Sequence, residues 1–182
     1  VVMKKKFTVQ NITLCALMTA LMAIFSWISL PLPNGVPITL QAFGIAVIGY
    51  TIGPLYGLVS IVAWILLGAV GVPVFASFRS GVSVLVGMTG GFIWGYPAMV
   101  VMCGLGKKRP LWLGIICGLV GLVIINITGA LQYSLLTDNT YWQSVLLVCV
   151  PYFLKDVICV VLVAVLSRGW NKTLSKVLNR QI

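Results

Sequence analysis

The chain has 182 residues, 60% of them hydrophobic and 8% charged, with a mean hydropathy of +1.12. This balance excludes an ordinary soluble domain and indicates a polytopic membrane protein. The net charge of +10 does not indicate a nucleic-acid-binding protein, because the cations lie at the ends of apolar runs rather than on one solvated face.

Six apolar segments follow one another, and we expect each to form a transmembrane helix. They span about residues 9–30, 38–52, 55–70, 84–105, 111–135 and 145–166. A proline-rich connection, 31–37, follows the first segment, and a tight Gly53–Pro54 turn joins the second to the third. A spanning helix needs about 20 apolar residues. The second and third segments are shorter than this, so they must tilt little or be broken. We therefore predict an all-α integral membrane protein in which residues 1–182 form a single six-helix domain.

The basic residues gather at alternate gaps between the segments. They precede the first segment, follow the fourth and follow the last: Lys4, Lys5, Lys6, Lys107, Lys108, Arg109, Arg168, Lys172, Lys176 and Arg180. Since loops rich in lysine and arginine stay in the cytoplasm, we predict that both termini are cytoplasmic. Connections 31–37, 71–83 and 136–144 then lie outside, with Arg79 in an outer loop and Lys155 within the membrane.

Side chains for catalysis or metal binding are scarce. There is no histidine, the only acidic residues are Asp138 and Asp156, and no serine or cysteine has a local base motif. The five cysteines lie in or beside apolar runs without metal-ligand spacing, where cysteine acts as a small hydrophobic residue. A nucleotide-binding loop is also missing. We therefore expect a protein that binds a ligand without transforming it, and that needs no metal or cofactor.

Polar residues gather towards the predicted outer side. Thr39 and Gln41 open the second helix, Asn126 lies in the outer half of the fifth, and Lys155 and Asp156 lie in the sixth. The fourth helix is expected to begin at Thr89, Gly90 and Gly91 and to carry Tyr96, one of several aromatic residues nearby. Charge inside the hydrocarbon is costly, so an intramembrane lysine or aspartate indicates a functional site.

Together with Arg79, these residues predict an outward-facing pocket for a small amphipathic acid. Other roles stay open. Gln41 and Asn126 would serve equally well in hydrogen bonds between helices, and Arg79 in contact with lipid headgroups. Lys155 and Asp156 would serve in a structural site, in which each needs a further partner because adjacent helical residues point some 100° apart.

The first helix carries a stripe of small residues at helical spacing, Ala16, Ala20 and Ala23. Such a stripe lets helices approach closely. It indicates either internal packing or a flat docking surface for a partner membrane subunit.

Four motifs resemble the BioY family over roughly residues 10–168. They are VPITLQ at 36–41, GPLYG at 53–57, LGAVGVPVF at 67–75 and GMTGGFIWGY at 87–96. Members of this family are biotin-specific substrate-capture (S) subunits of energy-coupling factor (ECF) transporters in the bacterial plasma membrane. The resemblance implies six membrane helices with both termini cytoplasmic, and biotin as the transported ligand. It also implies a transmembrane coupling subunit (EcfT) and two ATPase subunits as partners, with the Ala16/Ala20/Ala23 stripe resembling the face that contacts the coupling subunit.

The resemblance also suggests roles for individual residues. Asp156 would accept a hydrogen bond from the ureido ring of biotin, and Gln41, Asn126 or the backbone at 89–91 would serve the other ring groups. Arg79 is the first choice for the carboxylate tail and Lys155 the second. The family commonly has proline at the position of Met88, and a lysine three residues after the aspartate where this chain has Cys159.

Three rival functions stand beside this one. An S subunit for thiamine or riboflavin fits a cationic pocket poorly, because those vitamins lack the carboxylate. A stand-alone secondary transporter of a small organic acid would use the Lys155–Asp156 neighbourhood as a proton relay. A membrane enzyme is least supported, since histidine and carboxylate clusters are missing.

Overall fold

The computed structural model describes residues 9–33 and 35–179, with side chains as far as residue 172. In chain order its elements are α1 (Val9–Trp27), β1 (Ser29–Leu30), β2 (Ile38–Thr39), α2 (Gln41–Ile52), α3 (Pro54–Ala69), the 3-10 turn η1 (Ala76–Phe78), α4 (Val82–Val86), α5 (Gly90–Gly106), α6 (Leu111–Leu136), α7 (Tyr141–Val148) and α8 (Val150–Asn179). The predicted cytoplasmic residues Lys4, Lys5, Lys6 and Arg180, and the side chain of Lys176, lie outside this described part.

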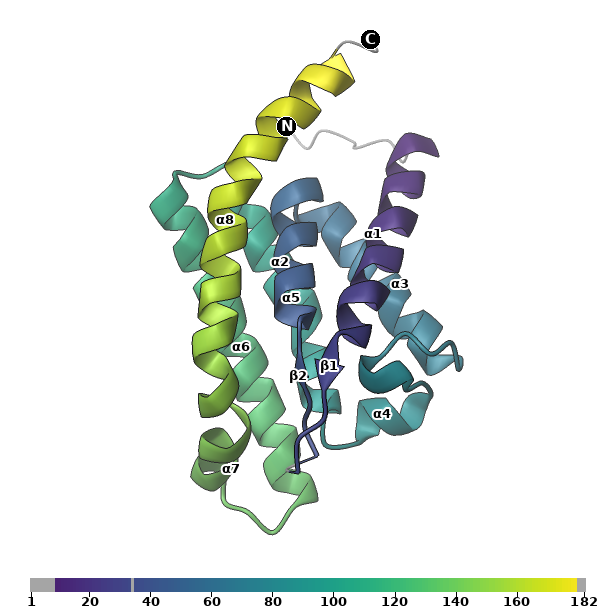
Figure 1. The fold of residues 1–182 in the computed structure, drawn as a ribbon, viewed down its shortest axis with the longest axis vertical. Helices are drawn as coiled ribbons and strands as arrows, with labels where there is room; N and C mark the ends of the chain where they lie inside the picture. The colour runs from purple at the N-terminus through teal and green to yellow at the C-terminus, as the bar shows by residue number, and fades with distance from the viewer. Residues whose placement is uncertain (1–8, 34, 180–182) are drawn as a thin grey trace.

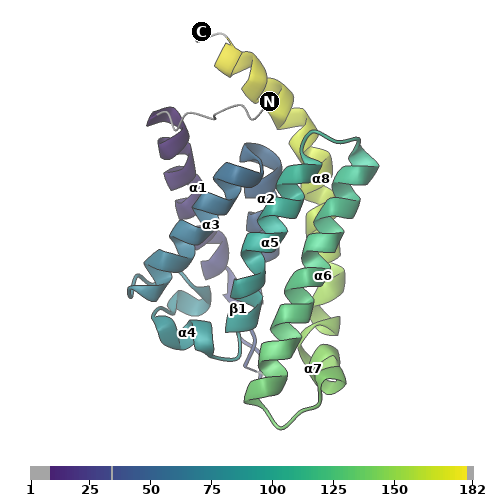
Figure 2. The same ribbon diagram turned by 180° about the vertical axis from the view of Figure 1, so that it is seen from behind.

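The helices pack side by side with α2 and α5 at the centre (Figure 1). On one side of this pair lie α1, α3 and α4, and on the other lie α6, α7 and α8, as the view from behind also shows (Figure 2). The start of α1, the α2–α3 turn, the α5–α6 connection and the last turns of α8 share one end, which we call the basic end. The β1–β2 hairpin, η1, α4 and α7 lie at the other, the hairpin end.

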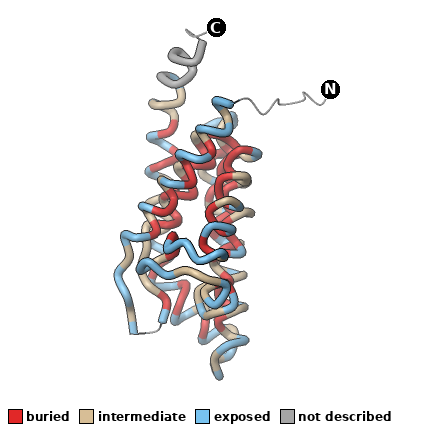
Figure 3. The backbone as a smooth tube through the Cα atoms, turned by 90° about the vertical axis from the view of Figure 1, so that its right-hand side faces the viewer, coloured by how far each residue is buried: buried red, intermediate tan, exposed pale blue. Residues whose placement is uncertain are grey.

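Buried residues follow the inward faces of the helices (Figure 3), while large apolar side chains such as Leu17, Trp112 and Leu162 remain exposed. Within the described ranges, three helices are long and apolar enough to cross a membrane: α1, α6 and α8. The apolar helices α2, α3 and α5 are shorter, with 12, 16 and 17 residues. An apolar surface of this extent suits contact with lipid rather than with water.

The first connection contains a short β-hairpin that the sequence did not predict. α1 ends at Trp27 rather than near residue 30, because residues 29–30 pair with residues 38–39. α2 therefore begins at Gln41, and Thr39 lies in β2 rather than in the helix. Two-residue strands are too short to leave an alternating pattern, so the apolar run gave no sign of the hairpin.

Two predicted helices are broken at the hairpin end. The fourth segment forms α4, then an extended Gly87, and α5 only from Gly90. The Gln132 side-chain amide donates hydrogen bonds to the carbonyls of Leu85 and Gly87, at 3.0 and 2.8 Å, and so satisfies backbone groups at the break. The sixth segment is divided into α7 and α8, where Pro151 lacks the N–H that a continuous helix would use.

The predicted Gly53–Pro54 turn is confirmed. Gly53 has φ of +88°, a left-handed conformation that glycine adopts without strain, and Pro54 is the first residue of α3, where its missing N–H costs nothing. Gly104 of α5 packs on this turn so closely that a Cβ there would lie 2.3 Å from the Pro54 nitrogen. Close backbone approach of this kind holds helices together where lipid offers no hydrophobic driving force.

Polar side chains join the helices at the basic end. Asn171 of α8 donates a hydrogen bond of 2.9 Å to the Tyr50 carbonyl, and the Lys107 ammonium donates to the Thr51 carbonyl. Arg168 likewise donates to a carbonyl of the α5–α6 connection. The last carbonyls of a helix have no partner within it, so Asn171 and Lys107 satisfy the end of α2 and link it to α8 and to the end of α5.

Replacing Gly104 by alanine should destabilise the protein, because the new methyl group would meet the backbone at Pro54 rather than a mobile side chain. Overpacking typically costs about 1–3 kcal/mol, which corresponds to a melting temperature lower by roughly 2–10 °C. Thermal unfolding of the purified protein in detergent measures this. Gly169→Ala is the matched control, since a Cβ at that position would have no atom within 4 Å and alanine favours the helix. Equal melting temperatures for the two variants would contradict the tight contact.

Candidate functional site

A pocket opens at the hairpin end between the hairpin, η1, and helices α2, α5, α6 and α8. It has about 800 Å³ of empty space when the solvent at its open mouth is counted. Most of the wall is apolar, with Phe75, Phe92 and Leu122 among its residues. The polar and aromatic residues on the wall are Thr39, Gln41, Arg79, Thr89, Asn126, Tyr96, Tyr152, Lys155 and Asp156.

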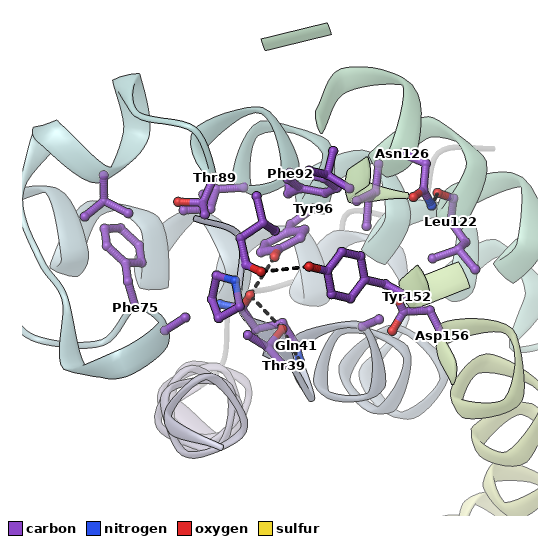
Figure 4. A pocket seen from close by; sticks show the side chains of 18 of the residues that line it. Thr39, Gln41, Phe75, Thr89, Phe92, Tyr96, Leu122, Asn126, Tyr152 and Asp156 are labelled. Carbon is purple, nitrogen blue, oxygen red and sulfur yellow. Dashed lines mark hydrogen bonds between the residues drawn. The ribbon is translucent and has the colours of Figure 1, made fainter. Parts of the chain in front are cut away.

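Gln41 is held by a closed hydrogen-bond network. Its side chain is buried, and its Nε2 donates to Ser26 Oγ at 3.2 Å. Its Oε1 accepts bonds from the Tyr96 hydroxyl at 2.7 Å and from Thr39 Oγ1 at 3.1 Å (Figure 4). The Tyr96 oxygen keeps lone pairs with which it can accept a further bond. Gln41 therefore shapes this part of the pocket, and Tyr96 presents an acceptor to a ligand.

Lys155 and Asp156 compensate one another. The Lys155 ammonium lies 2.5 Å from Asp156 Oδ1 and also donates to the Thr39 carbonyl at 2.5 Å. The long lysine side chain thus pairs with its neighbour despite the angle between adjacent helical positions. Asp156 Oδ1 is buried and, apart from this charge contact, accepts no directed hydrogen bond within the described part of the chain. A carboxylate has about four acceptor sites, so Asp156 retains capacity for ligand N–H groups.

Arg79 is presented by a strained turn. Ser77 and Phe78 both have positive φ, at 57° and 58°, a conformation that side chains other than glycine seldom adopt. The Ser77 N–H donates to Ser29 Oγ at 3.0 Å, and the Arg79 carbonyl accepts from the Phe75 N–H at 3.1 Å. Among the described residues the exposed Arg79 guanidinium has no hydrogen-bond or ion-pair partner, which leaves it available at the pocket mouth.

The residues on the two sides of the pocket differ in chemistry. In Figure 4, Phe75 and Thr89 lie on one side and Asn126 and Asp156 on the other, with Tyr152 between them. The Arg79 carbonyl accepts a hydrogen bond from the Phe75 N–H, so the Arg79 backbone lies on the Phe75 side of the pocket. A ligand lying in the pocket would therefore meet Asp156 with its partner Lys155, and Asn126, on one side, and would come near Arg79 on the other.

Asn126 and Tyr152 complete the polar wall. Asn126 Nδ2 donates to the Leu122 carbonyl at 2.8 Å, and no described residue donates to its Oδ1, which remains an acceptor. The Tyr152 hydroxyl donates to the Val36 carbonyl at 2.8 Å and holds the hairpin against α8. Sequence reasoning missed Tyr152, although its spacing of four residues from Asp156 places both on one helix face.

Two predicted ligand-binding glycines do not reach the pocket. Gly90 and Gly91 are buried where α5 meets its neighbours: a Cβ would lie 1.9 Å from the Leu85 carbonyl oxygen at Gly90, and 2.3 Å from that of Thr128 at Gly91. They serve close helix packing, and of the predicted residues 89–91 only Thr89 lies on the pocket wall.

The predicted alanine stripe is only partly on the surface. Ala16 and Ala20 are exposed on α1, whereas Ala23 is buried in the core at 6% exposure. Ala23 therefore packs internally, and an outward face could include only the first two.

The comparisons with known proteins agree with one another. The BioY family model matches residues 3–176. The biotin transporter BioY of Thermotoga maritima is 35% identical over 156 residues, 85% of this chain and 91% of the relative. The probable biotin transporter BioY of Pyrococcus horikoshii is 32% identical over 149 residues, 82% of this chain and 88% of the relative.

A solved structure has the same fold. It is the crystal structure of the S-component for biotin from an ECF-type ABC transporter, with a TM-score of 0.81 and 26% sequence identity. The match covers 90% of this chain and 92% of that chain. Because the BioY family model matches nearly all of its residues, the chain belongs to the BioY family.

Proposed function

We propose that this protein is the biotin-binding S component of an ECF-type ABC transporter, which captures biotin outside the cell without altering it. The observation that carries the proposal is the pocket wall, where Asp156 and Asn126 lie on one side and Phe75, whose N–H bonds the Arg79 carbonyl, lies on the other. The solved S-component for biotin and the curated biotin transporters support the choice of ligand.

Biotin matches this arrangement group by group. Its ureido ring has two N–H donors and one carbonyl acceptor, its thioether ring is apolar, and its valerate tail ends in a carboxylate. Asp156 accepts a ureido N–H, because a charge-assisted hydrogen bond is stronger than a neutral one. Asn126 Oδ1 or the Tyr96 oxygen accepts the second N–H. Phe75, Phe92 and Leu122 offer apolar surface to the thioether ring and the tail.

The two cations then have different tasks. Lys155 lies beside Asp156 and orients that carboxylate. Its ammonium has three N–H groups, so it can also donate to the ureido carbonyl. Arg79 lies on the Phe75 side and pairs with the valerate carboxylate. Because Lys155 is assigned to the ureido end, Arg79 remains our first choice for pairing with the carboxylate tail of biotin.

The topology that we propose is six crossings of the bacterial plasma membrane by one six-helix domain, with both termini in the cytoplasm. It is supported by Lys107 and Arg168, which lie at the basic end with the start of α1, while the pocket opens at the other end. In the assembled transporter, the coupling subunit EcfT and two ATPase subunits would energise import. The exposed Ala16 and Ala20 of α1 are our candidates for contact with the coupling subunit.

A vitamin panel tests the ligand directly. Isothermal titration of the purified protein with biotin, thiamine and riboflavin should give saturable binding of biotin alone, because only biotin carries the carboxylate that Arg79 would pair with. Tighter binding of either other vitamin would refute the proposal.

Asp156→Asn should weaken biotin binding by about 1–3 kcal/mol, or roughly 5–150-fold in Kd, because the amide loses the charge that strengthens the ureido hydrogen bond. Equilibrium binding measures the loss. Asp138→Asn is the matched control, since Asp138 is exposed and lies outside the pocket wall. If Asp156→Asn binds biotin as the native protein does, Asp156 is not a ligand group.

Arg79→Ala should weaken biotin by roughly 10–100-fold but change the affinity for biotin methyl ester little, because the ester has no charge for Arg79 to pair with. Competition with labelled biotin measures both ligands. Arg109→Ala, at the basic end, is the control and should leave both affinities unchanged. Equal losses for biotin and its ester in Arg79→Ala would remove the carboxylate role.

A further inference from the structure

A second hollow lies outside the pocket, also at the hairpin end. It holds about 1060 Å³ of empty space, counted to the surrounding solvent. Its wall includes Ser80, Ser83 and Gly87, and it shares Arg79, Val84 and Thr89 with the pocket. We call it the outer vestibule. Since these three residues border both spaces, the vestibule lies next to the pocket, with Arg79 at the border of both.

Side-chain contacts connect the walls of the vestibule to neighbouring elements. On one side, Ser29 Oγ lies 3.1 Å from Ser77 Oγ, and the Trp27 and Phe78 rings stack with centroids 5.1 Å apart, so η1 is held against the end of α1 and β1. On another side, Gln132 donates to the Gly87 carbonyl at 2.8 Å and holds the turn that joins α4 to α5.

The chemistry of the vestibule is polar. Ser80, Ser83 and Thr89 line the vestibule together with Arg79, and hydroxyls with a guanidinium can bind an amide and a further carboxylate. The inner pocket differs, since most of its wall is apolar.

We propose that the outer vestibule holds a group attached to the tail carboxyl of biotin, so that the site also binds biotin joined through an amide to an amino acid. The proposal rests on the function proposed above, which places the tail carboxyl at Arg79. A substituent on that carboxyl would pass Arg79 into the vestibule instead of meeting the pocket wall. The amino-acid carboxylate would lie in the vestibule, which Arg79 also borders.

Biotinyl-lysine, in which the lysine ε-nitrogen carries the biotinyl group, is the probe. It should displace labelled biotin from the purified full-length protein competitively. Its affinity should be within about 100-fold of that of biotin, because it loses at most one charge-assisted hydrogen bond at the amide. If biotin binds and biotinyl-lysine does not displace it in this range, the inference is overturned while the proposed function stands. If biotin itself does not bind, both fail.

Ser83→Trp tests the vestibule itself. Ser83 is exposed and borders the vestibule but not the inner pocket, so a bulky side chain there should obstruct only the attached group. We expect biotinyl-lysine to lose at least ~10-fold in affinity and biotin to change by less than ~2-fold, since a steric clash discriminates between ligands that differ only at that point. Ser80→Trp is a second variant with the same expectation, and retained biotin binding shows that each variant is folded.

Ser134→Trp is the matched control, because Ser134 on α6 borders neither space. It should leave both affinities unchanged. The inference is wrong if Ser83→Trp and Ser80→Trp weaken the two ligands equally, or weaken neither.

Discussion

The charge pair between Lys155 and Asp156 is the contact on which the pocket depends. Two charges on an apolar helix persist only when they compensate each other, because removing one partner of a buried pair typically costs about 3–5 kcal/mol. Lys155 meets this constraint and also donates to the Thr39 carbonyl, which fixes β2 to α8. One helical turn earlier, the Tyr152 hydroxyl donates to the Val36 carbonyl and fixes this residue to α8 as well. One helix therefore both carries the acidic group of the site and holds the hairpin over it.

The need to pair buried polar groups also applies to the backbone, and it explains where the helices are broken. Backbone without helical hydrogen bonds is tolerated at membrane depth only where it lines a cavity or is satisfied by protein groups. At the α4–α5 break, the Leu85 carbonyl accepts hydrogen bonds from Gln132 and from the indole of Trp94, and the break brings Thr89 to the pocket wall. At the α7–α8 junction, Cys149 Sγ lies 3.5 Å from the Asn126 carbonyl oxygen. Both breaks border the pocket.

These physical reasons decide how much the sequence could predict. Residues 111–135 form one long, largely apolar segment without proline or charge, and α6 (Leu111–Leu136) matches it within a residue. Charge in an apolar segment indicated Asp156 and Lys155, and both lie on the pocket wall. The hairpin and the α4–α5 break could not be predicted, because they depend on contacts such as that of Gln132 with Leu85, 47 positions away. Pro151 was a sequence signal for the α7–α8 break. Gly90 shows the limit most clearly, since a packing glycine and a ligand-binding glycine look the same in a sequence.

The two ends of the helix bundle differ in how much local movement their contacts allow. At the basic end the backbones touch directly, as where Gly104 meets Pro54, and Asn171 and Lys107 bind the last carbonyls of α2. At the hairpin end the pocket is covered by two-residue strands and a 3-10 turn, held by a few side chains such as Tyr152 and Ser29. Segments with few buried contacts open at a lower free-energy cost than packed helices do. A ligand can therefore be admitted by local movement of the hairpin and η1, while the basic end stays closed. The strained residues Ser77 and Phe78 lie in the segment that would move, next to Arg79, the cation that we expect to meet the ligand first.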